Sequence, residues 1–298
     1  MAEQSTEGGL DSPAQQPGTV AARIRAAMEK LSTKERQVAR AILSQYPAAG
    51  LETTQALSEL AKVSGPTVVR FVARLGYSSY REFQSDLRHE LLAKTASPVT
   101  LEPLYDDSGT TDSFRSSALG IFQSGLTETF KDLPESELEK AFELLSNTDL
   151  TLHLVGGRFS RILAENAELN LRQMRGGVHY YRDTREIMTG LVGFTRKDCL
   201  IVFDFRRYQA DTIAMARLAR EKRAQIILLT DPWMSPIAEV ADVVLSARVE
   251  APSPFDGFVA PMAVVETLIA GVHKRLGASA RERMLRLDEA SSRIETGT

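Results

Sequence analysis

The chain has 298 residues, a length that accommodates two domains. Of these residues 43% are hydrophobic and 25% are charged, which is typical of a soluble globular protein. It contains no apolar run of about 18 residues and no signal-peptide pattern, so we expect a cytoplasmic protein with no membrane partner. A single cysteine, Cys199, excludes an internal disulfide. No cofactor or metal is expected, because the four histidines are isolated in the sequence: His89, His153, His179 and His273.

The charges are unevenly distributed along the chain. Residues 20–98 carry 12 Lys and Arg against 7 Asp and Glu, whereas residues 99–298 carry 24 against 29. Between Lys62 and Arg81 there are four basic residues and no acidic one. A basic module on a chain of net charge −3 indicates one domain that binds a polyanion, joined to another with a different role. The alternative is an ordinary solvated helix face.

The first hundred residues divide by composition. Residues 1–18 are rich in Gly, Ser, Pro and Gln, and are predicted to be a disordered tail. Residues 19–94 have helical periodicity and form a predicted all-α domain, with Ser32 or Thr33 capping its second helix. Residues 95–112 are rich in Pro, Ser, Thr, Asp and Gly, and are the predicted linker. A second domain is expected over residues 113–298.

Two short helices within the first domain are predicted to form a helix-turn-helix. The first spans residues 54–61, a tight turn follows at Lys62, and the second begins at Gly65 and ends before Gly76. Ser64 is placed to cap the second helix, and Pro66 lies in its first turn, where a missing N–H costs little. Such a second helix enters the major groove of double-stranded DNA. A plain helical hairpin in a bundle is the alternative.

This arrangement assigns roles to individual side chains. Thr67 and Arg70 are expected to contact bases, because an arginine pairs bidentately with guanine. Gly65 is expected to let the backbone approach a phosphate. Phosphate contacts are further expected from the remaining basic residues, which are Lys62, Arg74 and Arg81.

The second domain is predicted to be α/β. Helices over 113–131 and 135–146 precede five short apolar runs that alternate with helical segments. This alternation predicts a five-stranded parallel sheet flanked by helices. The runs read LTLHLVGG, GGVHYY, CLIVFDF, QIILLTD and ADVVLSA.

Two segments of this domain predict an anion site. Gly156 and Gly157 directly follow the first predicted strand and precede a helix, where free backbone N–H groups accept anions. The third strand ends in a polar cluster, and the ends of adjacent parallel strands converge on one crevice. That cluster contains Asp204, Arg206, Arg207 and Tyr208. Arginines that are simply paired with surface acids are the alternative.

The N-terminal motifs resemble the RpiR/MurR family of transcription regulators. The resemblance covers residues 20–92. It rests on widely spaced residues that occur in the same order as in the family, namely Glu35-Arg36, Leu60-Ala61, Val63-Ser64, Thr67, Arg70-Phe71, Leu75-Gly76, Tyr80 and Phe83. Residues 152–245 resemble the sugar isomerase (SIS) domain that serves this family as its sensor. That likeness rests on GGRFS, Thr230, Ser235-Pro236 and Ala241-Asp242. Together they imply a homodimer or homotetramer that binds operator DNA and responds to a small anionic sugar derivative.

The chain departs from the SIS pattern at the ligand loop. Where that family has S-x-S-G-x-T, this chain has Asp204 to Gln209, and Arg158 replaces the second glycine of the first motif. Of the hydroxyls expected to hold a phosphate, Ser160 remains. One hypothesis is that the arginines bind a sugar acid or an organic phosphate. The other is that they pair with Asp204, Asp183 or Asp231 and leave a ligand-silent dimerisation domain.

An enzyme is the remaining alternative, because SIS folds also occur in phosphosugar isomerases. An isomerase needs a general base near the substrate carbon. His153 and His179 lie within predicted strands, and we expect them to be packed or exposed strand residues. With no base and acid at a convincing spacing, the sequence favours a regulator over an enzyme.

Overall fold

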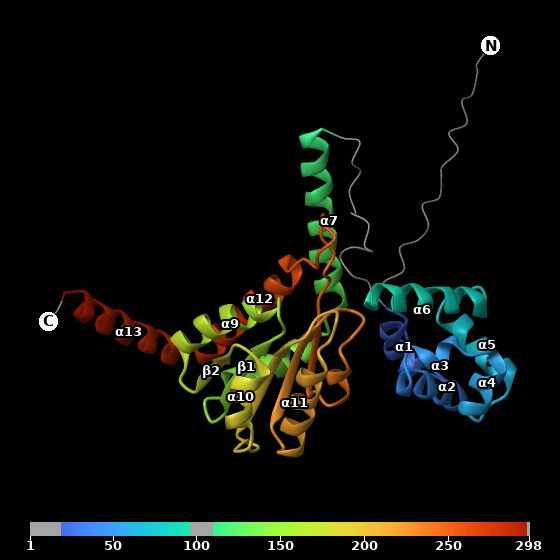
Figure 1. The fold of residues 1–298 in the computed structure, drawn as a ribbon, viewed down its shortest axis with the longest axis horizontal. Helices are drawn as coiled ribbons and strands as arrows, with labels where there is room; N and C mark the ends of the chain where they lie inside the picture. The colour runs from blue at the N-terminus through green and yellow to red at the C-terminus, as the bar shows by residue number, and fades with distance from the viewer. Residues whose placement is uncertain (1–18, 96–109, 297–298) are drawn as a thin grey trace, which may run out of the picture.

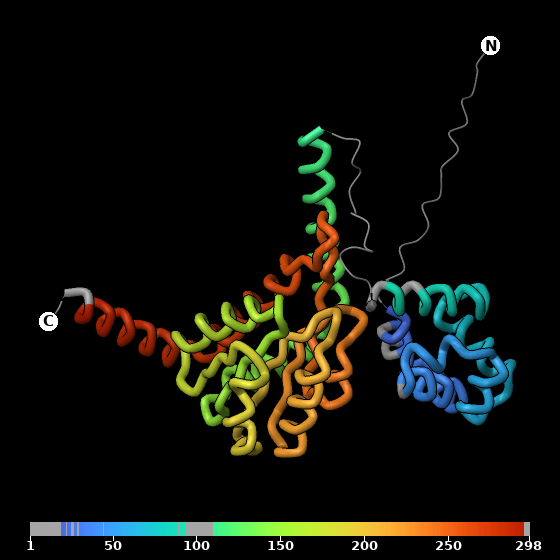
Figure 2. Tube along the Cα trace, in the orientation of Figure 1, coloured from blue at the N-terminus to red at the C-terminus, as the bar shows by residue number. Residues whose placement is uncertain are grey.

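The computed structural model describes residues 19–95 and 110–296, which form a helical N-terminal domain and an α/β C-terminal domain (Figures 1 and 2). The predicted tail and residues 96–109 of the predicted linker lie outside the described residues. Helix α6 ends at Thr95, and α7 begins at Thr111, two residues before the start predicted for that helix.

The N-terminal domain contains the helices that periodicity predicts, together with a short helix that it did not. Ser32 caps α2, because its hydroxyl accepts from the Glu35 N–H while the Glu35 carboxylate accepts from the Ser32 N–H, a reciprocal capping box. The unpredicted helix α3 follows Pro47 directly. The bounds are α1 Val20–Ala27, a 3₁₀ turn Met28–Lys30, α2 Thr33–Ser44, α3 Ala48–Leu51, α4 Thr54–Leu60, α5 Gly65–Arg74 and α6 Tyr80–Thr95.

One apolar cluster holds these helices together. It contains side chains from each of the longer helices, and they are fully buried: Ile24, Val38, Leu57, Phe71 and Phe83. Because α4 and α5 each contribute to this cluster, their relative angle is fixed by packing. The surface of α5 that faces away from the cluster is therefore presented in one orientation.

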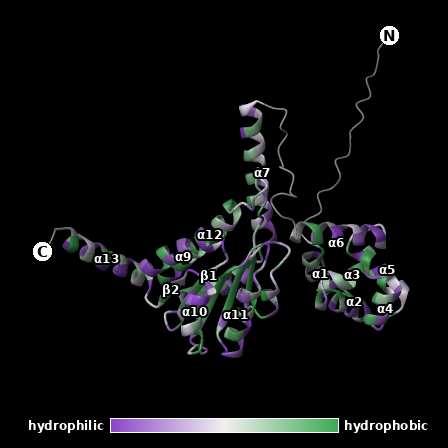
Figure 3. Cartoon of the chain, in the orientation of Figure 1, coloured by the Kyte–Doolittle hydropathy of each residue, from purple (hydrophilic) through white to green (hydrophobic). Residues whose placement is uncertain are grey.

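The C-terminal domain contains a five-stranded parallel sheet with the strand order β2-β1-β3-β4-β5. The three inner strands, β1, β3 and β4, read as nearly continuous apolar runs (Figure 3), because both of their faces are covered. Their bounds are β1 Thr151–Gly156, β2 Val178–Tyr181, β3 Asp198–Phe203, β4 Gln225–Thr230 and β5 Val243–Ser246. This confirms the predicted five-stranded parallel sheet.

Helices form a layer on each face of the sheet. One face packs against α8 (Glu135–Ser146), α9 (Arg161–Met174) and α12 (Val259–Leu276). The other face packs against α10 (Thr184–Leu191), α11 (Ala210–Glu221) and the 3₁₀ turn Pro236–Glu239. Right-handed crossovers between parallel strands produce this three-layer arrangement.

Two helices of the C-terminal domain extend beyond these layers. Helix α7 (Thr111–Asp132) and helix α13 (Ala278–Thr296) each project from the sheet and its covering helices (Figure 1). Their projecting parts carry exposed apolar side chains, namely Phe114 and Leu119 on α7 and Met284, Leu285, Leu287 and Ile294 on α13. Among the helices that the structure describes, none is both long enough and apolar enough to cross a membrane.

Candidate DNA-binding surface and ligand cavity

Helices α4 and α5 form the predicted helix-turn-helix. The turn between them passes through Lys62, whose φ of 54° places it in the left-handed region. Ser64 occupies the N-cap position of α5 with an extended backbone, as expected, but its hydroxyl bonds to the Thr67 hydroxyl at 2.9 Å and to no backbone N–H. The cap is therefore a contact between two side chains within the first turn.

Thr67 lies on a different face from the one that the sequence predicted. Its side chain is buried, with 2% exposure, and its hydroxyl contacts both Ser64 and the Arg70 guanidinium, which donates to it at 3.2 Å. A buried hydroxyl with two partners is unavailable to a base edge in this conformation. In the structure, Thr67 therefore positions the Arg70 side chain.

The exposed face of α5 carries one large apolar side chain and two basic side chains. Val69 is 51% exposed, and Arg70 and Arg74 are also exposed. The Arg74 Nε donates to the buried Glu35 carboxylate at 3.1 Å, which ties the end of α5 to the start of α2. The hydrogen bond from Ser32 lowers the pKa of Glu35, so this carboxylate is ionised.

The other predicted DNA-contacting residues lie in the turn before α5, at the start of α5 and on α6. Lys62 and Arg81 are exposed. A Cβ placed on Gly65 would meet no atom within 4 Å, so the backbone there is open to approach. Val69 was missed because its neighbours Val68 and Val72 belong to the core, and sequence alone does not separate an exposed valine from a buried one.

The predicted anion site lies where the strand order reverses direction, between β1 and β3. Ligands in open α/β sheets bind in the crevice outside the carboxyl ends of the strands at such a point. Gly156 ends β1, and a Cβ there would lie 2.6 Å from the backbone N and Cα of Arg161. This glycine therefore allows α9 to pack directly against the strand end. It does not itself line the crevice.

A cavity of about 420 Å³ occupies this crevice, and we call it the strand-end cavity. Its lining includes six residues that the sequence predicted, which are Gly157, Arg158, Ser160, Asp204, Arg206 and Arg207. It also includes residues that the sequence did not predict, which are Phe159, Phe205, Gln209, Phe255, Asp256 and Phe258. Phe255, Asp256 and Phe258 come from the segment before α12, and no local pattern linked that segment to the strand ends.

Arg206 forms its ion pair with an aspartate that the sequence did not propose, while its backbone N–H and its charge lower the pKa of Asp231, one of the three acids that the sequence did propose. Its side chain is 8% exposed, forms an ion pair with Asp256, and lies 4.8 Å from the centre of the Trp233 ring. Asp183 instead caps α10 by accepting from the N–H groups of Arg185 and Glu186. The pair with Asp256 neutralises Arg206 within the wall of the cavity.

Two other predicted ligand residues are hydrogen-bonded within the protein. The Tyr208 hydroxyl donates to Asp231 at 2.6 Å, and the buried Thr230 hydroxyl accepts from the Ser235 N–H at 3.1 Å. Neither Tyr208 nor Thr230 lines the strand-end cavity. Burial raises the pKa of Asp231 to about 6, because the charged carboxylate loses its hydration.

Ser160, the hydroxyl that the SIS resemblance singled out, is buried and engaged within the loop. It accepts from the Gly157 N–H at 2.9 Å and donates to the Phe203 carbonyl at 2.7 Å. These bonds hold the β1–α9 turn against the end of β3. A phosphate would have to displace them to use this hydroxyl.

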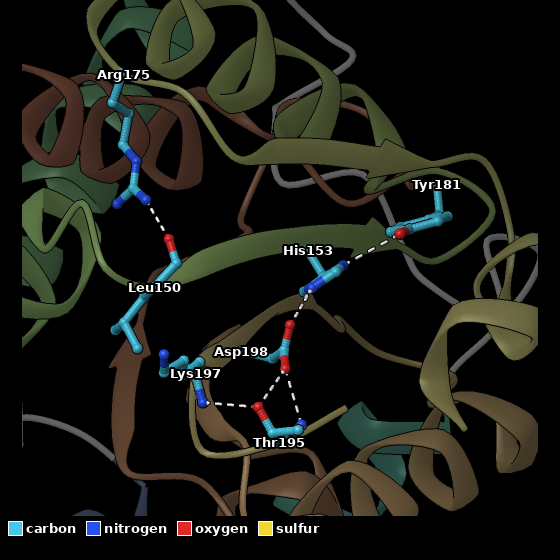
Figure 4. Close-up of polar contacts among 7 residues, drawn as sticks. All are labelled: Leu150, His153, Arg175, Tyr181, Thr195, Lys197 and Asp198. Carbon is cyan, nitrogen blue, oxygen red and sulfur yellow. Dashed lines mark hydrogen bonds and ion pairs between the residues drawn. The ribbon is translucent and has the colours of Figure 1, made fainter. Parts of the chain in front are cut away.

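His153 is part of a buried polar group at the other end of the sheet (Figure 4). Its Nε2 lies 2.9 Å from Asp198 and its Nδ1 lies 3.1 Å from the Tyr181 hydroxyl, while Asp198 also accepts from Thr195. Burial lowers the pKa of His153. Asp198 begins β3, at the edge opposite the strand-end cavity, so this histidine is a packed strand residue as expected.

Comparison with known proteins agrees with this division into two domains. Residues 18–94 match the helix-turn-helix domain of the rpiR family, and residues 144–271 match the SIS domain. The transcriptional regulator HexR of Pseudomonas aeruginosa is 26% identical over 272 residues, covering 90% of this chain and 93% of HexR. HexR of Escherichia coli K12 is also 26% identical, over 275 residues, covering 90% of this chain and 92% of its own.

Solved structures show the same fold. The Vibrio vulnificus NanR protein, complexed with ManNAc-6P, superimposes with a TM-score of 0.53 at 19% identity and covers 92% of this chain and 98% of NanR. The sugar isomerase domain of an RpiR transcription factor from Sphaerobacter thermophilus gives a TM-score of 0.54 at 25% identity, covering 59% of this chain and 98% of its own. With its helix-turn-helix and SIS domains in this order, the chain belongs to the RpiR family of transcription regulators.

Proposed function

We propose that this regulator binds double-stranded operator DNA through α5 and that a small organic anion in the strand-end cavity changes its affinity for that DNA. The observation that carries the DNA-binding part is the exposed face of α5, which presents Val69, Arg70 and Arg74, while Glu35, the acid that pairs with Arg74, is buried. The family resemblance implies an anionic carbohydrate derivative, either a sugar phosphate or a sugar acid. We further propose that the protein is not an enzyme.

The contacts on DNA follow from the positions of these side chains. Arg70 is proposed to read a guanine edge, and Val69 to contact a thymine methyl group. Lys62, Arg81 and the backbone at Gly65 are proposed to contact phosphates. Thr67 contributes by positioning Arg70, and Ser64 contributes by holding Thr67.

Arg74 is proposed to contact a phosphate with its outer guanidinium N–H groups. Its Nε is held by Glu35, and its side chain remains 54% exposed. The carboxylate thus fixes the direction of the arginine while leaving donors for the DNA backbone.

A homo-oligomer is proposed, because paired recognition helices match two-fold operators. The exposed apolar side chains on α7 and α13 give each protomer surfaces that a second copy would cover. Sedimentation velocity at micromolar concentration tests this proposal, and a monomer at that concentration would refute it.

DNA binding is tested by fluorescence anisotropy with duplexes from the upstream region of the protein's own gene. We expect specific binding that weakens steeply with salt, and a loss of about 10- to 100-fold in Arg70→Ala, since one bidentate contact contributes about 1–3 kcal/mol. The control is Arg36→Ala, an exposed arginine on α2. A loss in Arg70→Ala no greater than in this control would contradict the assignment of α5.

Control by a ligand is tested in the same assay with sugar phosphates, sugar acids and other organic acids. A ligand that changes DNA affinity by some factor must have its own affinity changed by the same factor when DNA is present. Specific DNA binding that no anion alters would leave the C-terminal domain as a ligand-silent dimerisation domain.

A further inference from the structure

The strand-end cavity has an aromatic wall. Phe159 and Phe255 are 59% and 61% exposed although they face a concave site, and Phe205 packs edge-to-face on Phe258 with ring centres 5.7 Å apart. Large apolar side chains that stay exposed around a cavity mark a binding site. A ligand with an apolar body would remove the rings of Phe159 and Phe255 from water.

Three polar side chains in the same wall are already engaged within the protein. The Ser160 hydroxyl uses both its donor and an acceptor position, Asp204 accepts from the Ser235 hydroxyl at 2.5 Å, and Arg206 pairs with Asp256. Exchanging such a bond for one to a ligand gains little free energy, whereas breaking it and leaving a buried group without a partner costs free energy. These three side chains would therefore give a body covered with hydroxyl groups little gain in hydrogen bonding.

The charges at the cavity favour a single anionic group. Three arginines and two aspartates line it, and Arg206 and Asp256 neutralise each other. Arg158 and Arg207 are exposed, and the Arg158 guanidinium lies 5.3 Å from the centre of the Phe159 ring. These two guanidinium groups offer planar donors that match a carboxylate.

We propose that the effector of this regulator is an aromatic organic acid, with its ring against Phe159, Phe255 and Phe258 and its carboxylate at Arg158 and Arg207. This inference rests on the proposed function, because it names the ligand class of the same cavity. It replaces the sugar body implied by the family resemblance with an aryl body. The volume of about 420 Å³ falls within the usual range for small-molecule sites.

Isothermal titration calorimetry on the full-length protein tests the proposal. The aromatic probes are phenylacetate and 3-phenylpropanoate, phenylacetamide is the neutral match, and gluconate and glucose 6-phosphate are the polar anions. We expect one of the aromatic acids to bind at least tenfold more tightly than the amide and both polar anions. The heat capacity change should be negative, because apolar surface is buried.

Two substitutions at exposed positions locate the site without disturbing the core. Phe255→Ser should weaken the aromatic acid at least tenfold, and Arg158→Gln should reduce the preference for the acid over the amide. The control Val192→Ser removes an apolar side chain that is 69% exposed and lies outside the cavity, and it should change neither property.

The outcomes separate this inference from the proposed function. Tighter binding of gluconate or glucose 6-phosphate would overturn the aromatic class while supporting control by a carbohydrate derivative. Binding of aromatic acids that is insensitive to both Phe255→Ser and Arg158→Gln would overturn the location. If none of the probes bound while specific DNA binding persisted, the aromatic class would be refuted and the DNA-binding part of the proposed function would stand.

Discussion

The substitution Gly156→Ala tests whether this glycine is required for the close packing of α9 against the end of β1. The added Cβ would lie 2.6 Å from the N and Cα of Arg161 and 2.9 Å from the carbonyl carbon of Ser160. Ordinary contacts begin near 3.4 Å, so the start of α9 must move by nearly 1 Å. All three atoms belong to the backbone, and no side-chain rotation relieves the clash. Overpacking of this kind costs about 1–3 kcal/mol, and we expect the upper end.

The chain provides its own probe for this measurement. Its single tryptophan, Trp233, lies in the C-terminal domain, so tryptophan fluorescence during heating reports the unfolding of that domain alone. A loss of about 3 kcal/mol corresponds to a decrease in Tm of about 6–12 °C for a domain of this size. DNA binding by the N-terminal domain should persist at temperatures below that transition.

Gly176→Ala is the matched control, because a Cβ there meets no atom within 4 Å and the residue has no positive φ. We expect its Tm to stay within about 2 °C of the unsubstituted protein. An unchanged Tm in Gly156→Ala would refute the packing argument, and would return Gly156 to the set of direct ligand-binding candidates.

Two further predictions concern buried carboxyl groups. Glu35→Ala removes the capping box of α2 and the partner of Arg74, so helix loss followed by circular dichroism should show the N-terminal domain destabilised by about 1–2 kcal/mol, whereas the exposed Glu59→Ala should have little effect. Because the folded pKa of Glu35 is lowered, its contribution is present above its unfolded pKa and is lost as the pH falls through the folded pKa. Asp231 has the opposite sign, because burial raises its pKa to about 6 and its contribution is therefore lost as the pH rises from about 4 through 6. By Trp233 fluorescence, the free energy of unfolding of Asp231→Asn should rise by about 2 kcal/mol relative to that of the unsubstituted protein between pH 4 and pH 7, and a difference independent of pH would refute the raised pKa.

Local patterns were sufficient to predict much of this protein. The capping box at Ser32, the helical stripe of α5 and the alternation of strands with helices each follow from residues close together in the chain. Helical periodicity and strand length act over a few residues, so the fold class and both kinds of domain could be predicted. The convergence of the β1 and β3 ends followed from the geometry of a parallel sheet.

The details of both sites depended on contacts between distant segments. Periodicity placed Thr67 on the outer face of α5, but the packing of α5 against its neighbouring helices rotated it inward and left Val69 exposed. Asp256 meets Arg206 across 50 positions of sequence, and Phe255 and Phe258 enter the cavity from the same segment. The sequence by itself determined which elements form. The tertiary structure decided which side chains share a cavity, because that depends on how packed elements are rotated and brought together across the fold.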